Sequence, residues 1–163
     1  MKDIWIRRAG EEDTDAIAAL ATAAFGSPDE AAIIARLQAD GDSLYSLVAH
    51  DDRQLLGHIQ FFAIAVDGAD IAAGLGPMVV EPSYQHRGID TGLVRFGLSL
   101  MQGSGRDPVF VLGHPDYYPR FGFSAEAASG FTAPWGGAVF MALRASDDAP
   151  CSGTLTYPAA FGS

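Results

Sequence analysis

The stretch that decides the fold is residues 78–93, which read MVVEPSYQHRGIDTGL. It has the pattern of a strand, a short loop and the start of a helix. Unpaired N–H groups and the positive end of the dipole make a helix N-terminus a binding site for phosphate, and a glycine such as Gly88 lets the backbone approach the ligand closely. Arg87 could add a charge-assisted contact. The alternative is an ordinary strand-to-helix connection with one turn glycine, because helix starts of this kind are common.

The residues that follow this stretch complete a β-loop-α-β unit. Apolar residues at helical spacing predict a helix over residues 88–102, which the sequence Gly103-Ser104-Gly105 stops. Residues 109–112 form a short continuous apolar run, which indicates a buried strand. Further strands are expected near residues 139–145 and 154–157, after a compact aromatic turn over 116–121 and a loop rich in glycine and alanine.

The residues that precede it predict a strand, two helices and an antiparallel meander. The strand covers residues 4–8 and the helices 12–24 and 28–39; Ser27-Pro28-Asp29-Glu30 has the form of a capping box at the second helix. Three strands over residues 44–49, 55–66 and 71–80 follow, joined by polar turns. Gly76-Pro77 predicts a bulge or an unpaired edge in the third strand, because proline donates no ladder hydrogen bond.

Size and charge limit the class of protein. A chain of 163 residues with 48% hydrophobic residues is expected to form a single domain over 1–163. Its formal charge of −10 would repel nucleic acid, so no nucleic-acid partner is expected. Apolar runs fall well short of the roughly 20 residues of a membrane helix, and the N-terminus lacks a signal-peptide pattern, so a cytoplasmic protein without a membrane partner is expected. The four histidines show no metal-ligand spacing.

Two motifs in this order resemble the GNAT superfamily of N-acetyltransferases. The family's pyrophosphate loop reads Gln/Arg-x-x-Gly-x-Gly/Ala, and the chain has Gln85-x-x-Gly88-x-Asp90. Its Phe-Tyr-x-x-x-Gly-Phe signature is similar to residues 118–123, and the longer run GHPDYYPRFGF over 113–123 resembles the bacterial YhbS-like branch. The resemblance covers most of the chain.

The resemblance implies a fold and a cofactor. The fold is α/β in the α+β sense, with a mixed, mostly antiparallel central sheet, helices on both faces and the β-loop-α-β unit in the centre. The cofactor is acetyl-CoA, whose pantetheine arm would pair with the strand before the loop as an added strand. The cofactor-binding residues would be Met78, Val79, Val80, Gln85, His86, Arg87, Gly88, Ile89, Asp90 and Thr91.

The resemblance also implies catalytic roles. Counted back from Gly122-Phe123, Tyr118 matches the family's proton-donating tyrosine. A phenol suits this role, because it stays protonated at neutral pH and can donate to a sulfur anion. The alternative is an aromatic packed on the core with its hydroxyl satisfied, a role for which the neighbouring Tyr117 is the natural candidate. For the base that deprotonates the amine we select His114, whose ordinary pKa lies near neutrality; Glu81, Glu30 and His58 are the other candidates. Phe25 and Glu30 would overhang the acceptor site, although Glu30 has the competing capping-box role.

One position departs from the family pattern. Asp90 stands where glycine or alanine is usual and brings a carboxylate toward the expected pyrophosphate. The chain is therefore either an enzyme that acetylates a primary amine of a small molecule or peptide in a ternary complex, or a non-catalytic acyl-CoA-binding or regulatory module. A dinucleotide-binding Rossmann domain is a weak third reading, since no GxGxxG follows a strand. Residues 154–157 could pair with another subunit in a homodimer.

Overall fold

The computed structural model describes residues 3–135 and 137–162, so both expected domain limits, 1 and 163, lie outside the described residues. Its centre is one twisted sheet in the order β1-β2-β3-β4-β5-β7; β8 pairs with β3, and β6 pairs with β8. Only the pairs β4–β5 and β6–β8 are parallel among the described strands. The expected mixed, mostly antiparallel sheet is confirmed, and a parallel Rossmann sheet is excluded. The strands are β1 (Trp5–Arg8), β2 (Ser43–His50), β3 (Leu55–Val66), β4 (Ala69–Val80), β5 (Val109–Leu112), β6 (Phe131–Thr132), β7 (Phe140–Leu143) and β8 (Gly153–Thr156).

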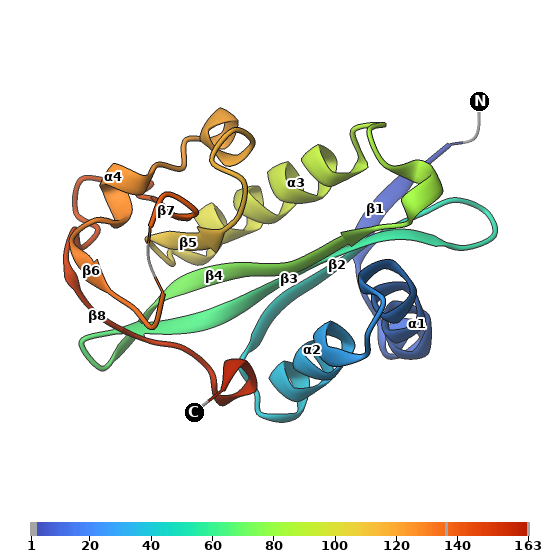
Figure 1. Ribbon diagram of the computed structural model, residues 1–163, viewed down its shortest axis with the longest axis horizontal. Coiled ribbons are helices and arrows are strands. Elements are labelled where there is room, and N and C mark those ends of the chain that lie inside the picture. Colours follow the sequence, from blue (N-terminus) through green and yellow to red (C-terminus); the bar gives the residue numbers. More distant parts are fainter. Residues whose placement is uncertain (1–2, 136, 163) are drawn as a thin grey trace.

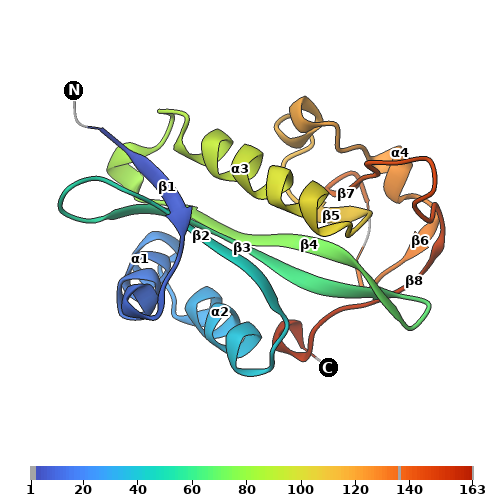
Figure 2. The same cartoon turned by 180° about the vertical axis from the view of Figure 1, so that it is seen from behind.

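Helices cover both faces of the sheet (Figures 1 and 2). The long helix α3 lies along one face, and the pair α1 and α2 packs against the other. The expected helices on both faces of the sheet are therefore confirmed. The helices are α1 (Thr14–Phe25), α2 (Asp29–Ala39), α3 (Ile89–Ser104) and α4 (Ala125–Ala128), with short 3-10 helices η1 (Glu11–Asp13), η2 (Pro82–Tyr84), η3 (Tyr118–Phe121) and η4 (Ala159–Phe161).

The strand β3 forms the middle of the core. Ile59 and Phe61 are fully buried in the cluster beneath α3, whereas Phe62 belongs to the cluster that includes Leu37 of α2. Side chains of a strand alternate between its faces, so one central strand supplies both clusters. Gly97 of α3 lets that helix approach closely, because a Cβ there would lie 2.1 Å from the ring of Phe61.

The strand β4 has the predicted irregularity at Gly76-Pro77. Its pairing with β3 shifts between Ile59↔Met78 and Phe61↔Leu75, which is the expected bulge. On its other edge β4 pairs with β5 only over residues 73–75. The two parallel strands therefore separate after the bulge, and the segment from Met78 to Val80 keeps one edge without a strand partner among the described residues.

Several local predictions need correction. The predicted capping box at the second helix is wrong, because the N-cap residue is Pro28. The Ser27 hydroxyl accepts from the Asp29 N–H at 3.2 Å, and among the described residues no hydrogen bond between Ser27 and Glu30 completes a capping box. The short elements α4 and β6 lie in the segment predicted to be a loop. The last strand pairs with β3 and β6 within the chain, so that pairing with a second subunit is not needed to satisfy it.

Candidate functional site

A cavity of about 350 Å³ lies where β4 leaves β5. Its walls come from the end of β4, the loop that leads into α3, the first turn of α3 and the segment after β5. The crossover from β4 through α3 to β5 brings these segments together, because parallel neighbouring strands end at the same edge of the sheet. The lining residues are Met78, Val80, Tyr84, Gln85, His86, Ile89, Asp90 and His114.

The start of α3 presents free backbone donors at this cavity. Gly88 is the N-cap and has φ +83°, a left-handed conformation that glycine adopts without strain, and His86 also has a positive φ of 64°. The first helical bond runs from the Gly92 N–H to the Gly88 carbonyl at 3.0 Å. The N–H groups of Gly88, Ile89 and Asp90 have no acceptor within the described part of the chain. Free donors at the positive end of a 16-residue helix form an anion site.

Asp90 occupies one further donor of this site. Its Oδ1 accepts from the Thr91 N–H at 2.8 Å, so the carboxylate turns back onto its own helix start. An acidic residue in the first turn stabilises the helix through the dipole. The same geometry places a negative charge beside the free N–H groups and withholds the Thr91 N–H from an external anion.

In the loop between β4 and α3, Arg87 stacks on a ring and Gln85 bonds the backbone. The Arg87 guanidinium carbon lies 5.0 Å from the centre of the Tyr84 ring and forms no ion pair with any residue that the structure describes. The Gln85 amide donates to the Val80 carbonyl at 3.4 Å, which ties the loop to the end of β4. Arg87 therefore remains available to pair with a phosphate, held over Tyr84 until then.

The two adjacent tyrosines at the start of η3, Tyr117 before it and Tyr118 as its first residue, have different surroundings. Tyr118 is 7% exposed and packs in the α3 cluster against Gly113 and Phe123, and its hydroxyl makes no hydrogen bond to a described residue. Burial, followed by the neighbouring Tyr117 and the Asp90 charge, raises the pKa of Tyr118 well above its usual value. Tyr118 is therefore a fully protonated phenol at neutral pH, and the charge of Asp90, which lines the cavity, contributes to this.

Tyr117 instead binds the start of α3. Its hydroxyl and the Thr91 Oγ1 share a hydrogen bond of 2.9 Å. Burial is the main cause that raises the pKa of Tyr117, and the Asp90 carboxylate adds to it, whereas the bond to Thr91 lowers it. This contact fixes η3, and with it Tyr118, to the helix that carries the free N–H groups.

The candidate bases separate clearly. His114 lines the cavity with an exposed imidazole, and its carbonyl accepts from the Tyr117 N–H at 3.0 Å. Glu81 is committed to capping η2, where its carboxylate accepts from both the N–H and the hydroxyl of Ser83. His58 is fully buried on the α1 and α2 side, its Nε2 bonds the Ser46 hydroxyl at 2.7 Å, and burial lowers its pKa to about 4. Of these three, only His114 can reach a ligand in the cavity.

Some predicted residues lie outside the cavity wall. Val79 is 4% exposed and pairs with His58, so its side chain points to the opposite face of the sheet. Phe25, which is 43% exposed at the end of α1, and Glu30 in the first turn of α2 do not line the cavity. The structure thus brings together most of the predicted cofactor residues and His114, and leaves the two predicted acceptor residues apart from them.

Two residues of the site were not predicted to belong to it. Tyr84 lines the cavity and supports Arg87, and Tyr117 anchors η3 to α3. The position of Tyr84, three residues before Arg87 in the loop, is the signal that could have identified it. No spacing in the sequence connects Tyr117 with Thr91.

No group of three or more His, Cys, Asp and Glu side chains among the described residues could hold a metal ion. None of the described helices has the length and apolar character needed to cross a membrane.

Comparison with known proteins gives consistent matches. The model of the acetyltransferase (GNAT) domain matches residues 5–125. The uncharacterized N-acetyltransferase YhbS of Escherichia coli K12 is 35% identical over 141 residues, 84% of each chain, and YjhQ of the same strain is 35% identical over 131 residues, 77% of this chain and 72% of that protein.

Solved structures agree with these matches. The E. coli YhbS structure in complex with CoA superposes with a TM-score of 0.92 at 32% identity, covering 100% of this chain and 94% of that one. A GNAT family acetyltransferase from Brucella melitensis in complex with acetyl-CoA gives a TM-score of 0.84 at 34% identity, with 99% of both chains covered.

Proposed function

Since this chain belongs to the GNAT family of N-acetyltransferases, we propose that it transfers the acetyl group of acetyl-CoA to a primary amine of a small molecule or peptide. The observation that carries the proposal is the strip of free N–H groups at the start of α3, which faces a cavity beside the unpaired edge of β4. Similar proteins crystallised with CoA and acetyl-CoA support this cofactor. The same relationship favours an enzyme over a non-catalytic acyl-CoA-binding module.

The described residues fit the phosphate end of this cofactor. The N–H groups of Gly88, Ile89 and Asp90 would donate to the pyrophosphate, and Arg87 would leave Tyr84 to add a charge-assisted contact. His86, Gln85 and Thr91 would shape the loop around them.

The end of β4 fits the extended arm of the cofactor. Met78 and Val80 line the cavity, and Val79 contributes backbone only, because its side chain points to the other face. An added strand uses main-chain hydrogen bonds, which the unpaired edge of this segment offers. When bound, the cofactor supplies an acyl thioester that an amine can attack directly.

Proton transfer would be divided between two residues. The hydroxyl of the buried Tyr118 side chain, protonated at neutral pH, would donate to the sulfur that departs. His114 would accept the proton of the amine, since its imidazole is exposed in the cavity. Positioning of the amine would supply the largest share of the rate, as in other bimolecular reactions held in one site.

The acceptor amine would lie near the first turn of α2. Glu30 is free of the capping role that competed with amine binding, because Pro28 caps α2. Its carboxylate, together with the exposed ring of Phe25, could therefore hold an ammonium group. A homodimer and a location in the cytoplasm stay predictions.

An amine panel tests the proposal directly. The chain is incubated with acetyl-CoA and each amine, and released CoA is measured with a thiol reagent. Release that depends on the amine, and that Tyr118→Phe reduces without weakening acetyl-CoA binding, is expected. Acetyl-CoA binding without any amine-dependent release across polyamine, amino-sugar, amino-acid and peptide acceptors would favour the non-catalytic module.

A further inference from the structure

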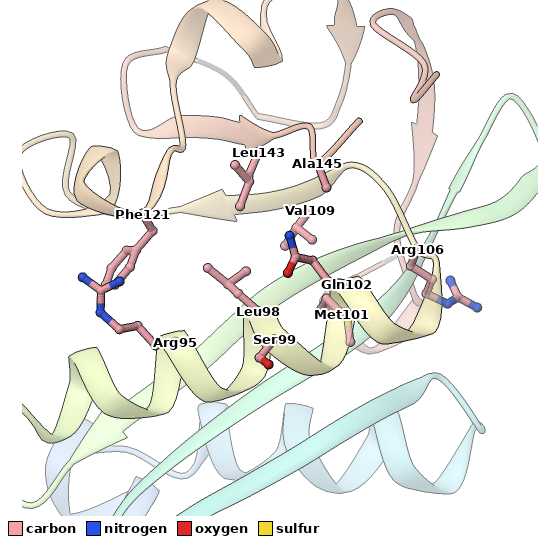
Figure 3. A pocket seen from close by; sticks show the side chains of 10 residues that line it. All are labelled: Arg95, Leu98, Ser99, Met101, Gln102, Arg106, Val109, Phe121, Leu143 and Ala145. Carbon is pink, nitrogen blue, oxygen red and sulfur yellow. The ribbon is translucent and has the colours of Figure 1, made fainter. Parts of the chain in front are cut away.

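A second cavity, of about 320 Å³, lies between the last turns of α3 and the strands β5 and β7. Figure 3 shows the side chains that enclose it: those of α3 and of Arg106, just after it, form one wall, and those of β5, β7, η3 and Ala145, just after β7, form the other. It shares no lining residue with the cavity at the start of α3. The lining residues are Arg95, Leu98, Ser99, Met101, Gln102, Arg106, Val109, Phe121, Leu143 and Ala145.

The floor of this cavity is apolar. Val109 and Leu143 are cross-strand partners of β5 and β7, and both point toward Leu98 and Met101 of α3. The next α-helix along the chain, α4, has four residues and packs against β7, so no second long helix among the described residues fills the space beside α3. A slot with aliphatic walls therefore remains open at the edge of the sheet.

A free cation stands at one end of the slot. The Arg95 guanidinium carbon lies 5.2 Å from the centre of the Phe121 ring, and Arg95 forms no ion pair within the described residues. Arg106, at the other end, is engaged: its guanidinium donates to the Asp70 carboxylate and the Ala72 carbonyl, each at 2.7 Å, and points out of the slot in Figure 3. The charge offered to a ligand is thus one positive charge at the Arg95 end.

A neutral polar group lies between these ends. The Gln102 amide projects toward the space between α3 and β5 and makes no side-chain hydrogen bond to a described residue. From Arg95 to Met101 the helix rises about 9 Å, the length of an extended chain of about eight carbon atoms. The slot therefore matches a ligand with one negative end and an apolar body, and a dinegative or zwitterionic ligand would leave a charge without a partner.

We propose that this slot binds a medium-chain monocarboxylate, with the carboxylate on Arg95 and the aliphatic chain between the half-buried Leu98 and Leu143, over a floor formed by the buried Met101 and Val109. Both walls of the slot come from one chain, so a second subunit is not required to form the site. The site is separate from the proposed acetyl-CoA site, since Asp90 and Gln102 are about 18 Å apart along the helix. The inference does not depend on the acetyltransferase proposal.

Calorimetric titration of the full chain with octanoate tests this site. Saturable binding is expected, with at least about fivefold weaker binding for Arg95→Gln and for octanamide, which keeps the chain and loses the charge. Arg53→Gln is the matched control, because Arg53 is an arginine in the β2–β3 turn and far from the slot, and it should bind as the wild type does. Ala145→Phe, which adds a ring at the rim, should also weaken binding. Thermal unfolding of each variant checks that the fold is intact.

Three results would overturn the proposal. The first is no saturable binding of octanoate up to about 20 mM, far weaker than a shaped pocket of this size provides. The second is equal binding by the wild type, Arg95→Gln and Ala145→Phe. The third is displacement of octanoate by CoA in direct competition, which would place the carboxylate in the cofactor cavity. Octanoate affinity unchanged by saturating CoA supports two separate sites.

Discussion

Replacing Asp90 should strengthen binding of acetyl-CoA in two separable steps. Asp90→Asn removes the charge but keeps an oxygen that can accept from the Thr91 N–H, whereas Asp90→Ala removes both the charge and the acceptor. Comparing the two variants therefore distinguishes electrostatic repulsion from competition for a backbone donor. The matched control is Asp29→Asn, which removes an acidic residue from the first turn of α2.

The magnitudes follow from the geometry of the helix start. A phosphate charge about 5 Å from the carboxylate, with an effective dielectric of about 50 to 80, is repelled by about 1 kcal/mol. Asp90→Asn should therefore bind acetyl-CoA about fivefold more tightly. Asp90→Ala also releases the Thr91 N–H, worth about another 1 kcal/mol to a charged acceptor, so its affinity should rise about 30-fold. Loss of the first-turn carboxylate should lower the free energy of unfolding by about 0.5 to 1 kcal/mol.

Isothermal titration at low salt and at 1 M salt measures both steps. At 1 M salt the Debye length is about 3 Å, so the gain of Asp90→Asn should shrink, while the additional gain of Asp90→Ala should persist. Equal affinities for the wild type and both variants would refute the reasoning. Weaker binding by Asp90→Ala would show that the carboxylate supports the loop more than it repels the cofactor.

Three further outcomes are expected. Tyr118→Phe should lower kcat while acetyl-CoA affinity is unchanged. Because burial raises the pKa of Tyr118, the wild-type kcat should not fall near pH 10, where an ordinary tyrosine ionises. A fall of kcat near pH 10 would contradict the assignment of Tyr118 as the proton donor. His58 is neutral in the folded protein, because its pKa of about 4 lies below the unfolded value of about 6.5. Its contribution to the free energy of unfolding is therefore complete above about pH 6.5 and is lost as the pH falls. Urea unfolding should show that the free energy of unfolding is about 2 kcal/mol lower at pH 5 than at neutral pH, and His58→Gln should remove this difference. Gly97→Ala should destabilise the fold by about 1 to 3 kcal/mol in chemical unfolding, because its Cβ would lie 2.1 Å from the Phe61 ring, whereas Gly103→Ala, with open space around it in the same helix, should stabilise by up to about 1 kcal/mol.

The long elements could be predicted from sequence because their patterns repeat. Residues 55–66 were expected to form one strand, and β3 covers the same span, since apolar residues fill both faces between two polar turns. The bulge at Gly76-Pro77 was predictable for a different reason, namely the missing proline donor. The two-residue β6 and four-residue α4 carry too few residues to show a period, and so a loop was expected there.

The capping box shows how a local motif can mislead. Ser27 and Glu30 have the required spacing, but Ser27 Oγ accepts from the Asp29 N–H, two residues on, and Pro28 becomes the N-cap. The sequence pattern does not indicate whether the Ser27 hydroxyl accepts from the N–H of Asp29 or from that of Glu30. That choice decides whether Glu30 is free to meet an acceptor.

The site itself could be predicted only in parts, because its parts are joined by a contact between distant segments. The Gln85-to-Asp90 motif and the tyrosine signature were two separate observations in the sequence. In the structure Thr91 follows Asp90, and its hydroxyl binds Tyr117, the neighbour of Tyr118.

This contact has a consequence for how the departure at Asp90 should act. The Asp90 carboxylate accepts from the Thr91 N–H and also contributes to the raised pKa of both tyrosines. A change at Asp90 would thus affect the Thr91 N–H and the electrostatic surroundings of both tyrosines together. If a phosphate displaces the carboxylate from the Thr91 N–H, the same event alters the electrostatic environment of Tyr118. We therefore expect cofactor binding and the pKa of Tyr118 to be coupled in this chain, an effect that requires a charged side chain at position 90.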